Sequence, residues 1–159
     1  MNKKIVIILI GLIIMIVSVS LAHMHFSKGS INVNQSLFVS DISYSQLQDN
    51  IKSSVNIQAY FMCEQNTDCD YVKFSLIKPI MNKYQIEVLA KVIFVDMDEV
   101  NRQVSSTRLK ELYQIQSIPA FVLIDTSSSI VIATLEYTKF NPLTQDIIEE
   151  WLLSHGLLR

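Results

Sequence analysis

The sequence has few of the residues that interrupt secondary structure, with three glycines and three prolines among 159 residues. We therefore expect long helices and strands, joined by turns that Asn, Asp and Ser build. No internal repeat and no low-complexity tract is present, which argues against a solenoid or a disordered chain. Half of the residues are apolar, so the chain can bury one ordinary core, and we expect one folded domain.

An excess of basic residues is also missing, since 13 Lys and Arg face 15 Asp and Glu, for a net charge of -2. A protein that binds nucleic acid usually carries a basic patch, so we expect no nucleic-acid partner. The cysteines and histidines do not show the spacing of a metal site. We therefore expect neither a metal nor another cofactor.

The amino terminus has the composition of a membrane segment. Lys3 and Lys4 precede an uncharged run of eighteen residues, Ile5 to Ala22, which as a helix would be about 27 Å long against a hydrocarbon core of roughly 30 Å. Positive charge before the run predicts that the amino end stays in the cytoplasm and the rest lies outside. The alternative is a signal peptide cleaved near Ala22, where small residues offer a peptidase site. We favour the uncleaved anchor because the run exceeds a usual signal core.

These features divide the chain into a transmembrane signal-anchor at 1–22, a polar tether at 23–40 and a folded domain at 41–159. No cysteine stands directly after the apolar run, which excludes a lipid-modified cysteine anchor. The predicted location is the cell membrane, with a single pass and an extracytoplasmic carboxyl-terminal domain; cleavage would instead give a secreted protein. In either case two cysteines can form a lasting disulfide.

Apolar runs and helical spacing alternate along the folded domain. Nearly continuous apolar runs predict central strands at 55–62 and 88–95, followed by a hairpin of strands at 120–125 and 130–135. Apolar residues three and four apart predict helices at 41–53, from near Cys69 to about 84 with a bend at Pro79, at 101–113, and from Asn141-Pro142 to Gly156. A short strand at 37–39 would lie in the tether. Strands that alternate with helices indicate an α/β fold, with a mixed central sheet and helices on both faces.

The two cysteines, Cys63 and Cys69, lie where the first central strand gives way to a helix. The first turn of a helix leaves N–H groups unpaired and carries the positive end of the macrodipole, which favours a thiolate. On one helix the two cysteines would be about 9 Å apart along the axis, too far for a disulfide. A bridge therefore requires residues 64–68 to curl back as a loop. Such a bridge would suit either a redox-active pair or a structural staple.

Three segments of the chain resemble proteins with the thioredoxin fold, over about residues 43–158. They are the strand, cysteine and helix of Ile57 to Val72, the strand ending in Phe94-Val95-Asp96-Met97-Asp98, and Tyr113 to Phe121 with its Ile118-Pro119 pair. The resemblance implies a thioredoxin-like three-layer sandwich. It also implies a cis bond at Ile118-Pro119, facing the active-site cysteine, and Ile118 backbone groups offered to an extended partner chain. The exported chain further resembles the bacteriocin-associated accessory thioredoxins of Gram-positive bacteria.

The sequence departs from that family at the chemistry. The family motif has two cysteines separated by two residues, whereas Val72 stands where the second would follow Cys69. By this alignment Cys69 matches the exposed nucleophile. Cys63 is then the candidate resolving thiol. An acidic residue that would serve as a buried base is missing from the preceding strand, and Gln58 is the nearest polar residue.

Three interpretations follow from these residues. The first is a membrane-anchored thiol-disulfide oxidoreductase, in which Cys69 attacks a protein disulfide and Cys63 resolves the mixed disulfide. The second is a redox-inactive binding module with a structural Cys63–Cys69 disulfide, which holds an extended peptide in the groove near Pro119. The third is an unrelated α/β domain with two incidental thiols. The expected partners are thus protein thiols or disulfides, or a peptide at the cis-proline groove, and the membrane through residues 5–22.

Overall fold

The computed structural model describes residues 36–54, 56–98 and 106–158. The predicted membrane segment and most of the predicted tether lie outside these described residues, as do residues 99–105 at the start of the third predicted helix. Within the described ranges, no helix has both the length and the hydrophobicity needed to cross a bilayer. The compact folded unit begins at Ser36. Residues 36–40, predicted as tether, therefore belong to it.

Five strands form one mixed sheet, in the order β1-β3-β2-β4-β5. Strands β1 and β2 each pair with β3 in parallel, β4 runs antiparallel to β2, and β5 runs antiparallel to β4. The elements in chain order are β1 (Phe38–Ser43), α2 (Tyr44–Ser53), β2 (Ile57–Cys63), α3 (Thr67–Asp70), the π-helix η2 (Tyr71–Ile77), α4 (Lys78–Lys83), β3 (Leu89–Asp96), α5 (Ser106–Tyr113), β4 (Ala120–Asp125), β5 (Ile130–Glu136) and α6 (Gln145–Ser154). The predicted mixed sheet and closing hairpin are confirmed.

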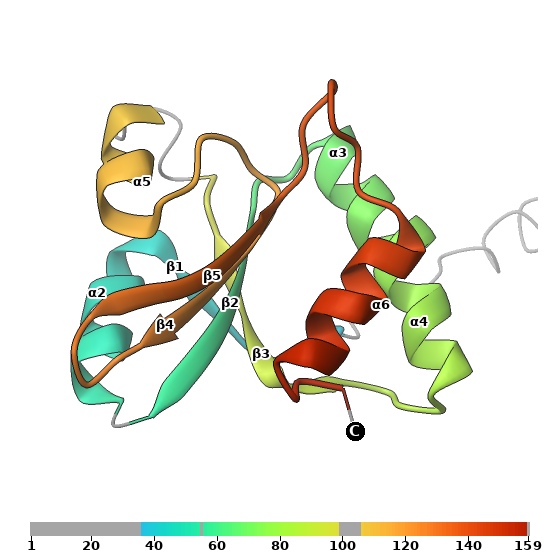
Figure 1. Ribbon diagram of the computed structural model, residues 1–159, viewed down its shortest axis with the longest axis horizontal. Coiled ribbons are helices and arrows are strands. Elements are labelled where there is room, and N and C mark those ends of the chain that lie inside the picture. The colour runs from blue at the N-terminus through green and yellow to red at the C-terminus, as the bar shows by residue number, and fades with distance from the viewer. Residues whose placement is uncertain (1–35, 55, 99–105, 159) are drawn as a thin grey trace, which may run out of the picture. The chain divides into compact units, whose positions relative to one another are not determined.

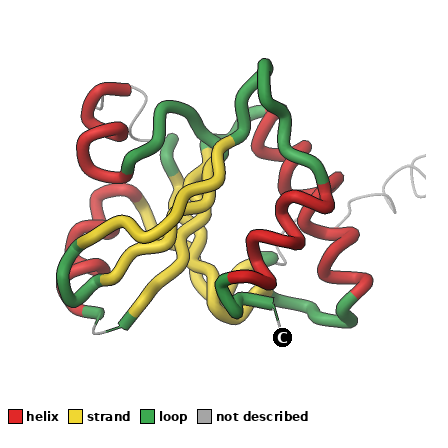
Figure 2. The backbone as a smooth tube through the Cα atoms, in the orientation of Figure 1, coloured by secondary structure: helices red, strands yellow, loops and turns green. Residues whose placement is uncertain are grey.

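Helices cover both faces of this sheet, which gives three layers (Figure 1). On one face lie α2 and α5, and on the other lie α3, η2, α4 and α6 (Figure 2). Strand β2 shows why its sequence is apolar throughout: Phe61 and Cys63 face one cluster of buried side chains, while Tyr60 and Met62 face the other. A central strand that is buried on both sides cannot alternate apolar with polar residues.

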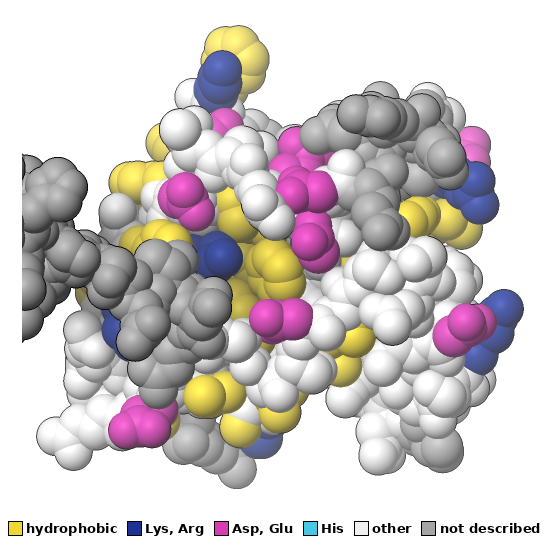
Figure 3. Space-filling view, turned by 180° about the vertical axis from the view of Figure 1, so that it is seen from behind, with side chains coloured by type: hydrophobic (Ala, Val, Ile, Leu, Met, Phe, Trp, Pro, Cys, Tyr) yellow, Lys and Arg dark blue, Asp and Glu magenta, His cyan; other side chains and the backbone are white. Residues whose placement is uncertain are grey.

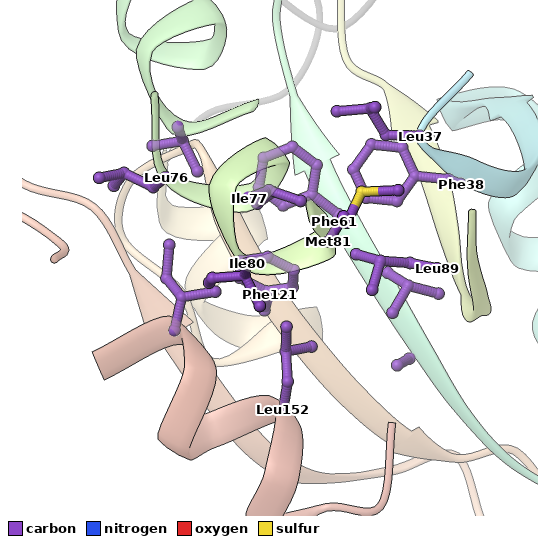
Figure 4. Close-up of a cluster of buried hydrophobic side chains, with 14 of the residues drawn as sticks. Leu37, Phe38, Phe61, Leu76, Ile77, Ile80, Met81, Leu89, Phe121 and Leu152 are labelled. Carbon is purple, nitrogen blue, oxygen red and sulfur yellow. The ribbon is translucent and has the colours of Figure 1, made fainter. Parts of the chain in front are cut away.

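The larger cluster contains three aromatic contacts of Phe61. Its ring lies 4.6 Å from that of Phe121 and 5.2 Å from that of Phe38, centroid to centroid, and 6.2 Å from Phe94. Apolar side chains of η2, α4 and α6 pack over these rings (Figure 4). The helical run that contains Cys69 lies on this face of the sheet. Packing against these rings therefore fixes the position of that helical run.

Two tyrosines anchor the opposite face. Tyr60 donates a hydrogen bond to Asn50 Oδ1 at 2.9 Å, and the Tyr113 hydroxyl accepts one from Gln48 Nε2 at 2.7 Å. Burial disfavours the charged phenolate, and it raises the pKa of Tyr60 to about 12. The pKa of Tyr113 is also raised, mainly by burial. Both bonds join α2 to a tyrosine of the smaller cluster of buried side chains.

Two predicted helix starts are wrong. Residues 41–43 belong to β1 and not to the first helix, because they pair with Phe94 to Asp96 of β3, and the helix begins at Tyr44 after Ser43. The last helix does not begin at Asn141-Pro142. Asn141 instead closes a turn with Thr138, and α6 begins after Thr144, whose hydroxyl accepts from the Ile147 N–H. The predicted end at Gly156 is confirmed by its positive φ of 66° and by the bond from its N–H to the Leu153 carbonyl.

The helical run after the cysteines differs in kind from the single bent α-helix that was predicted. It begins as α3, widens into the π-helix η2 and returns to α-helix at Lys78, one residue before Pro79. Proline has no N–H to continue a ladder of hydrogen bonds, and Pro79 stands in the first turn of α4, directly after the π-helix. The proline therefore marks the change of helix type.

Candidate functional site

Cys63 is the last residue of β2, and the sheet fixes its position. It pairs with Asp96 of β3, and its carbonyl accepts a hydrogen bond from the Met97 N–H at 2.9 Å. Its side chain is fully buried. One partner of the predicted cysteine pair is thus held on the rigid part of the fold.

A short loop turns the chain from β2 into the helix that carries Cys69. The Gln65 N–H donates to Asp98 Oδ1 at 2.6 Å, which ties this loop to the end of β3. Asn66 is the N-cap of α3: its side-chain Oδ1 accepts from the Cys69 N–H at 2.9 Å. Cys69 therefore lies in the first turn of the helix, as predicted. Its backbone N–H is not left unpaired, because it donates to the Asn66 side chain.

The loop brings the two cysteines together as a disulfide, with 5.8 Å between their Cα atoms. This is the curled loop that the sequence required. The expectation that Cys69 is exposed is wrong, because the residue is 2 % exposed and packs in the larger apolar cluster with Val72 of the next turn. The first turn of this helix packs in the same buried cluster as Cys63, so the Cys69 sulfur points inward to it.

Gln58 does not take the place of a missing buried base. It lies five positions before Cys63 on β2, roughly 16 Å away along an extended strand. Its Oε1 is buried and has no hydrogen-bond partner among the described residues. No group of three or more His, Cys, Asp or Glu side chains within the described ranges is placed to hold a metal ion.

The Ile118-Pro119 bond is cis, as the resemblance implies. Met62 of β2 pairs with Ala120 of β4, so the antiparallel register puts Pro119 beside Cys63. Pro119 is buried and Ile118 is half-buried. No hydrogen bond joins the Ile118 backbone to another residue within the described ranges. The structure thus brings the four predicted site residues to one end of the sheet.

Sequence reasoning missed one residue at this end, Glu136. Its Oε2 accepts hydrogen bonds from the backbone N–H groups of Gln116 at 2.8 Å and Ser117 at 3.0 Å. The Ser117 hydroxyl lies 3.2 Å from the same oxygen and 2.8 Å from the Tyr137 carbonyl, which is the nearer acceptor for its single proton. The only sequence signal was an acidic residue at the end of an otherwise uncharged strand, Ile130 to Glu136.

Aromatic side chains lie at the end of the sheet that carries the disulfide. Three loops meet here, after β2, before β4 and after β5 (Figure 2). As a separate feature, the face seen from behind has acidic side chains around an apolar area of the surface (Figure 3). Tyr71, 44 % exposed, contacts Tyr137 with ring centroids 6.3 Å apart, and the Lys73 ammonium lies 5.0 Å from the Phe94 ring centre.

Asn66→Ala is expected to lower the free energy of unfolding by about 1 kcal/mol, because the Cys69 N–H loses its acceptor. Urea denaturation followed by circular dichroism measures this change. Asn82→Ala is the matched control, since Asn82 is exposed within α4 and alanine is a better helix former. Equal losses in the two variants would show that the cap contributes nothing.

No protein-family model and no curated protein sequence matches this chain. Among solved structures it is similar to the thioredoxin NaTrxh of Nicotiana alata, with 15 % identity over 74 % of this chain and 93 % of that chain and a TM-score of 0.47. Thioredoxin f2 of Chlamydomonas reinhardtii is 12 % identical, with 76 % and 99 % covered and a TM-score of 0.49. The thioredoxin of Malassezia sympodialis is 17 % identical, with 77 % and 98 % covered and a TM-score of 0.46.

The fold itself is assigned from the chain's own topology. The first three strands are parallel and β2 lies inside the sheet, next to the antiparallel hairpin of β4 and β5. The helix after β2 carries a cysteine in its first turn, and the cis bond before β4 lies beside the end of β2. These are the features that the resemblance of the sequence implied. By its strand order, strand directions and layers, the described part of this chain has a thioredoxin-like fold.

Proposed function

We propose that this chain is a thiol-disulfide oxidoreductase that acts on protein disulfides through Cys69, with Cys63 as its resolving thiol. The observation that carries the proposal is the position of the Cys63–Cys69 disulfide. It joins the end of the central strand β2 to the first turn of a helix. The register between β2 and β4 places Pro119 beside Cys63. A cysteine in the first helical turn is where the helix macrodipole stabilises a thiolate.

The exchange can be written with all atoms and electrons accounted for. In the reduced protein, the Cys69 thiolate attacks one sulfur of a substrate disulfide, which forms a mixed disulfide and releases one substrate thiolate. The Cys63 thiolate then attacks Cys69, which re-forms the Cys63–Cys69 bond and releases the second substrate thiolate. Two electrons pass to the substrate. The reverse sequence oxidises a substrate dithiol.

Burial of the disulfide sets a condition on this chemistry. A substrate thiolate must reach a sulfur along the line of the existing bond, and both cysteines are almost fully buried. The loop of residues 64–66 is the segment that has to move. It is held by the bond from Gln65 to Asp98, by the Asn66 cap and by the bond from the Asp70 N–H to the Asn66 carbonyl, which are few contacts for a segment of the fold. Exchange therefore requires local opening of this loop.

A second candidate is a redox-inactive thioredoxin-fold module in which the disulfide only braces the fold. Two observations favour it: Cys63 is fully buried and Cys69 is 2 % exposed, and the Cys69 N–H is already used by Asn66. A buried disulfide is usually inert. In this case the surface at Ile118-Pro119 would hold a partner peptide without any covalent step.

Equilibration with glutathione distinguishes the two candidates. The full-length chain in detergent is incubated in buffers of graded glutathione ratio, and free thiols at Cys63 and Cys69 are counted by alkylation and mass spectrometry. An oxidoreductase should be half reduced between about −120 and −270 mV. A bridge that stays oxidised until below about −300 mV would identify a structural disulfide and exclude the exchange function.

The proposed location is the outer side of a membrane, with the chain anchored through residues 5–22. Support comes from the two lysines before that apolar run and from the pairing of both cysteines, which an oxidising compartment allows. Protease added to intact cells should degrade the folded domain if it lies outside. Full protection of the domain until the cells are lysed would contradict this location.

A further inference from the structure

The loop before Pro119 is held by an acceptor from the last residue of β5. Glu136 pairs with Ala120 across the β4–β5 ladder, which brings its side chain next to the residues that precede the cis bond. One carboxylate oxygen accepts from two successive backbone N–H groups, those of Gln116 and Ser117. Bonds to a charged acceptor are stronger than neutral ones, and two successive N–H groups form a concave site for an anion.

A second contact fixes the other side of the same loop. The Tyr137 N–H donates to the Pro119 carbonyl at 3.0 Å, and the Ser117 hydroxyl reaches the Tyr137 carbonyl. Ile118 therefore lies between a backbone N–H held by Glu136 and a carbonyl held by Tyr137. Because each peptide unit is planar, holding the neighbours of Ile118 limits the directions in which its own N–H and C=O can point.

The loop lies at the edge of the core: Pro119 is buried and Ile118 packs against the smaller cluster of buried side chains, but the residues before them reach the surface. Gln116 is exposed, Ser117 and Ile118 are half-buried, and the Ile118 backbone makes no hydrogen bond with another described residue. Backbone groups that are held in place but left without a protein partner are suited to an extended polypeptide, which carries matching donors and acceptors. The bonds from Glu136 thus order the part of this loop that reaches the surface.

We propose that Glu136 is a positioning residue for partner binding: its carboxylate sets the loop of residues 116–119 so that the Ile118 backbone can bind an extended polypeptide. This inference rests on the partner site of the proposed function, and it holds for exchange and for binding alone. Preorganisation of this kind strengthens binding because the loop need not be ordered when the partner arrives.

The test uses the full-length chain in detergent and a polypeptide without reactive sulfur, the reduced and carboxymethylated insulin B chain carrying a fluorescent label. Fluorescence anisotropy measures its affinity. Glu136→Ala should weaken binding roughly tenfold, because the two N–H groups lose their acceptor. Glu136→Gln should recover part of this loss, since its amide oxygen can accept the same bonds without the charge. A general loss of structure would not be rescued in this way.

Glu149→Gln is the matched control. Glu149 also accepts two bonds, from Lys83 Nζ and the Tyr84 hydroxyl, but these lie on α4 and the segment after it. The control should bind the B chain as the unchanged protein does. Equal affinities for Glu136→Ala and the unchanged protein would overturn the inference, and so would absence of B-chain binding by the unchanged protein.

Kinetics separate this inference from the exchange function. With insulin as a disulfide substrate, the loss in Glu136→Ala should fall on KM and not on kcat, because the residue acts on binding and not on the sulfur. A loss confined to kcat would overturn the positioning role. If the unchanged protein reduces no insulin but its B-chain affinity depends on Glu136, the exchange function fails and the inference stands.

Discussion

Cys69→Ser is expected to abolish reduction of insulin disulfides by the full-length chain, because it removes the sulfur that attacks the substrate. Cys63→Ser should behave differently. It leaves the attacking sulfur but removes the thiol that resolves the mixed disulfide, so a covalent adduct with the substrate should accumulate. Turbidity of reduced insulin measures the first effect, and non-reducing electrophoresis followed by mass spectrometry measures the second.

The two variants are controls for each other. Both lose the same bridge between Cys63 and Cys69, and the chain-entropy model gives about 2.4 kcal/mol for so small a ring in either case. A difference in reactivity between them therefore cannot come from the lost brace alone. If neither variant traps substrate and both lose only stability, the disulfide is structural. Full activity in both would show that neither sulfur takes part.

The parts of the fold that the sequence predicted correctly depend on burial. Strands β2 and β3 are apolar along most of their length because side chains on both faces of the sheet are covered, and this leaves a run that can be read directly. The hairpin of β4 and β5 has a polar turn between two apolar runs. In each case the local pattern and the final environment agree, as in most well-packed proteins.

The misplaced boundaries depend on contacts distant in sequence. Residues 41–43 have helix-capping composition, but pairing with Phe94 to Asp96, more than fifty positions away, keeps them in a strand. Asn141-Pro142 has the composition of a helix start, but Thr138 and Thr144 form the turn and the cap instead. The spacing of apolar residues from Tyr71 to Ile77 does not distinguish a π-helix from an α-helix, so the sequence did not predict the π-helix.

The candidate site divides in the same way. The proximity of Cys63 and Cys69 followed from the polar loop between them, and the cis bond at Pro119 followed from the resemblance. The burial of the sulfurs did not follow, because it depends on how closely the helix packs on the sheet. Nor did Glu136, whose bonds to Gln116 and Ser117 join residues about twenty positions apart.

The largest expected change in stability comes from Phe61→Ala. Phe61 is fully buried in the centre of the sheet and contacts the rings of Phe38, Phe94 and Phe121. Truncation to alanine removes apolar burial and leaves a cavity that these rings can only partly fill (Figure 4), a loss of about 3–5 kcal/mol. Domains of this size have about 5–15 kcal/mol in total. Urea denaturation should therefore show a much lower midpoint, or an unfolded variant.

Phe140→Ala is the matched control, because it removes the same side chain from a fully exposed position in the loop between β5 and α6. Surface substitutions change stability by about 0.5 kcal/mol or less, so its midpoint should not move measurably. Similar losses in the two variants would contradict the packing described for β2. Since β2 ends at Cys63, a Phe61→Ala variant that still folds should also expose the disulfide, and reduction by glutathione should become faster. That acceleration links the core of the sheet to the reactivity of the sulfurs, because local opening at the strand end becomes easier when its packing is lost.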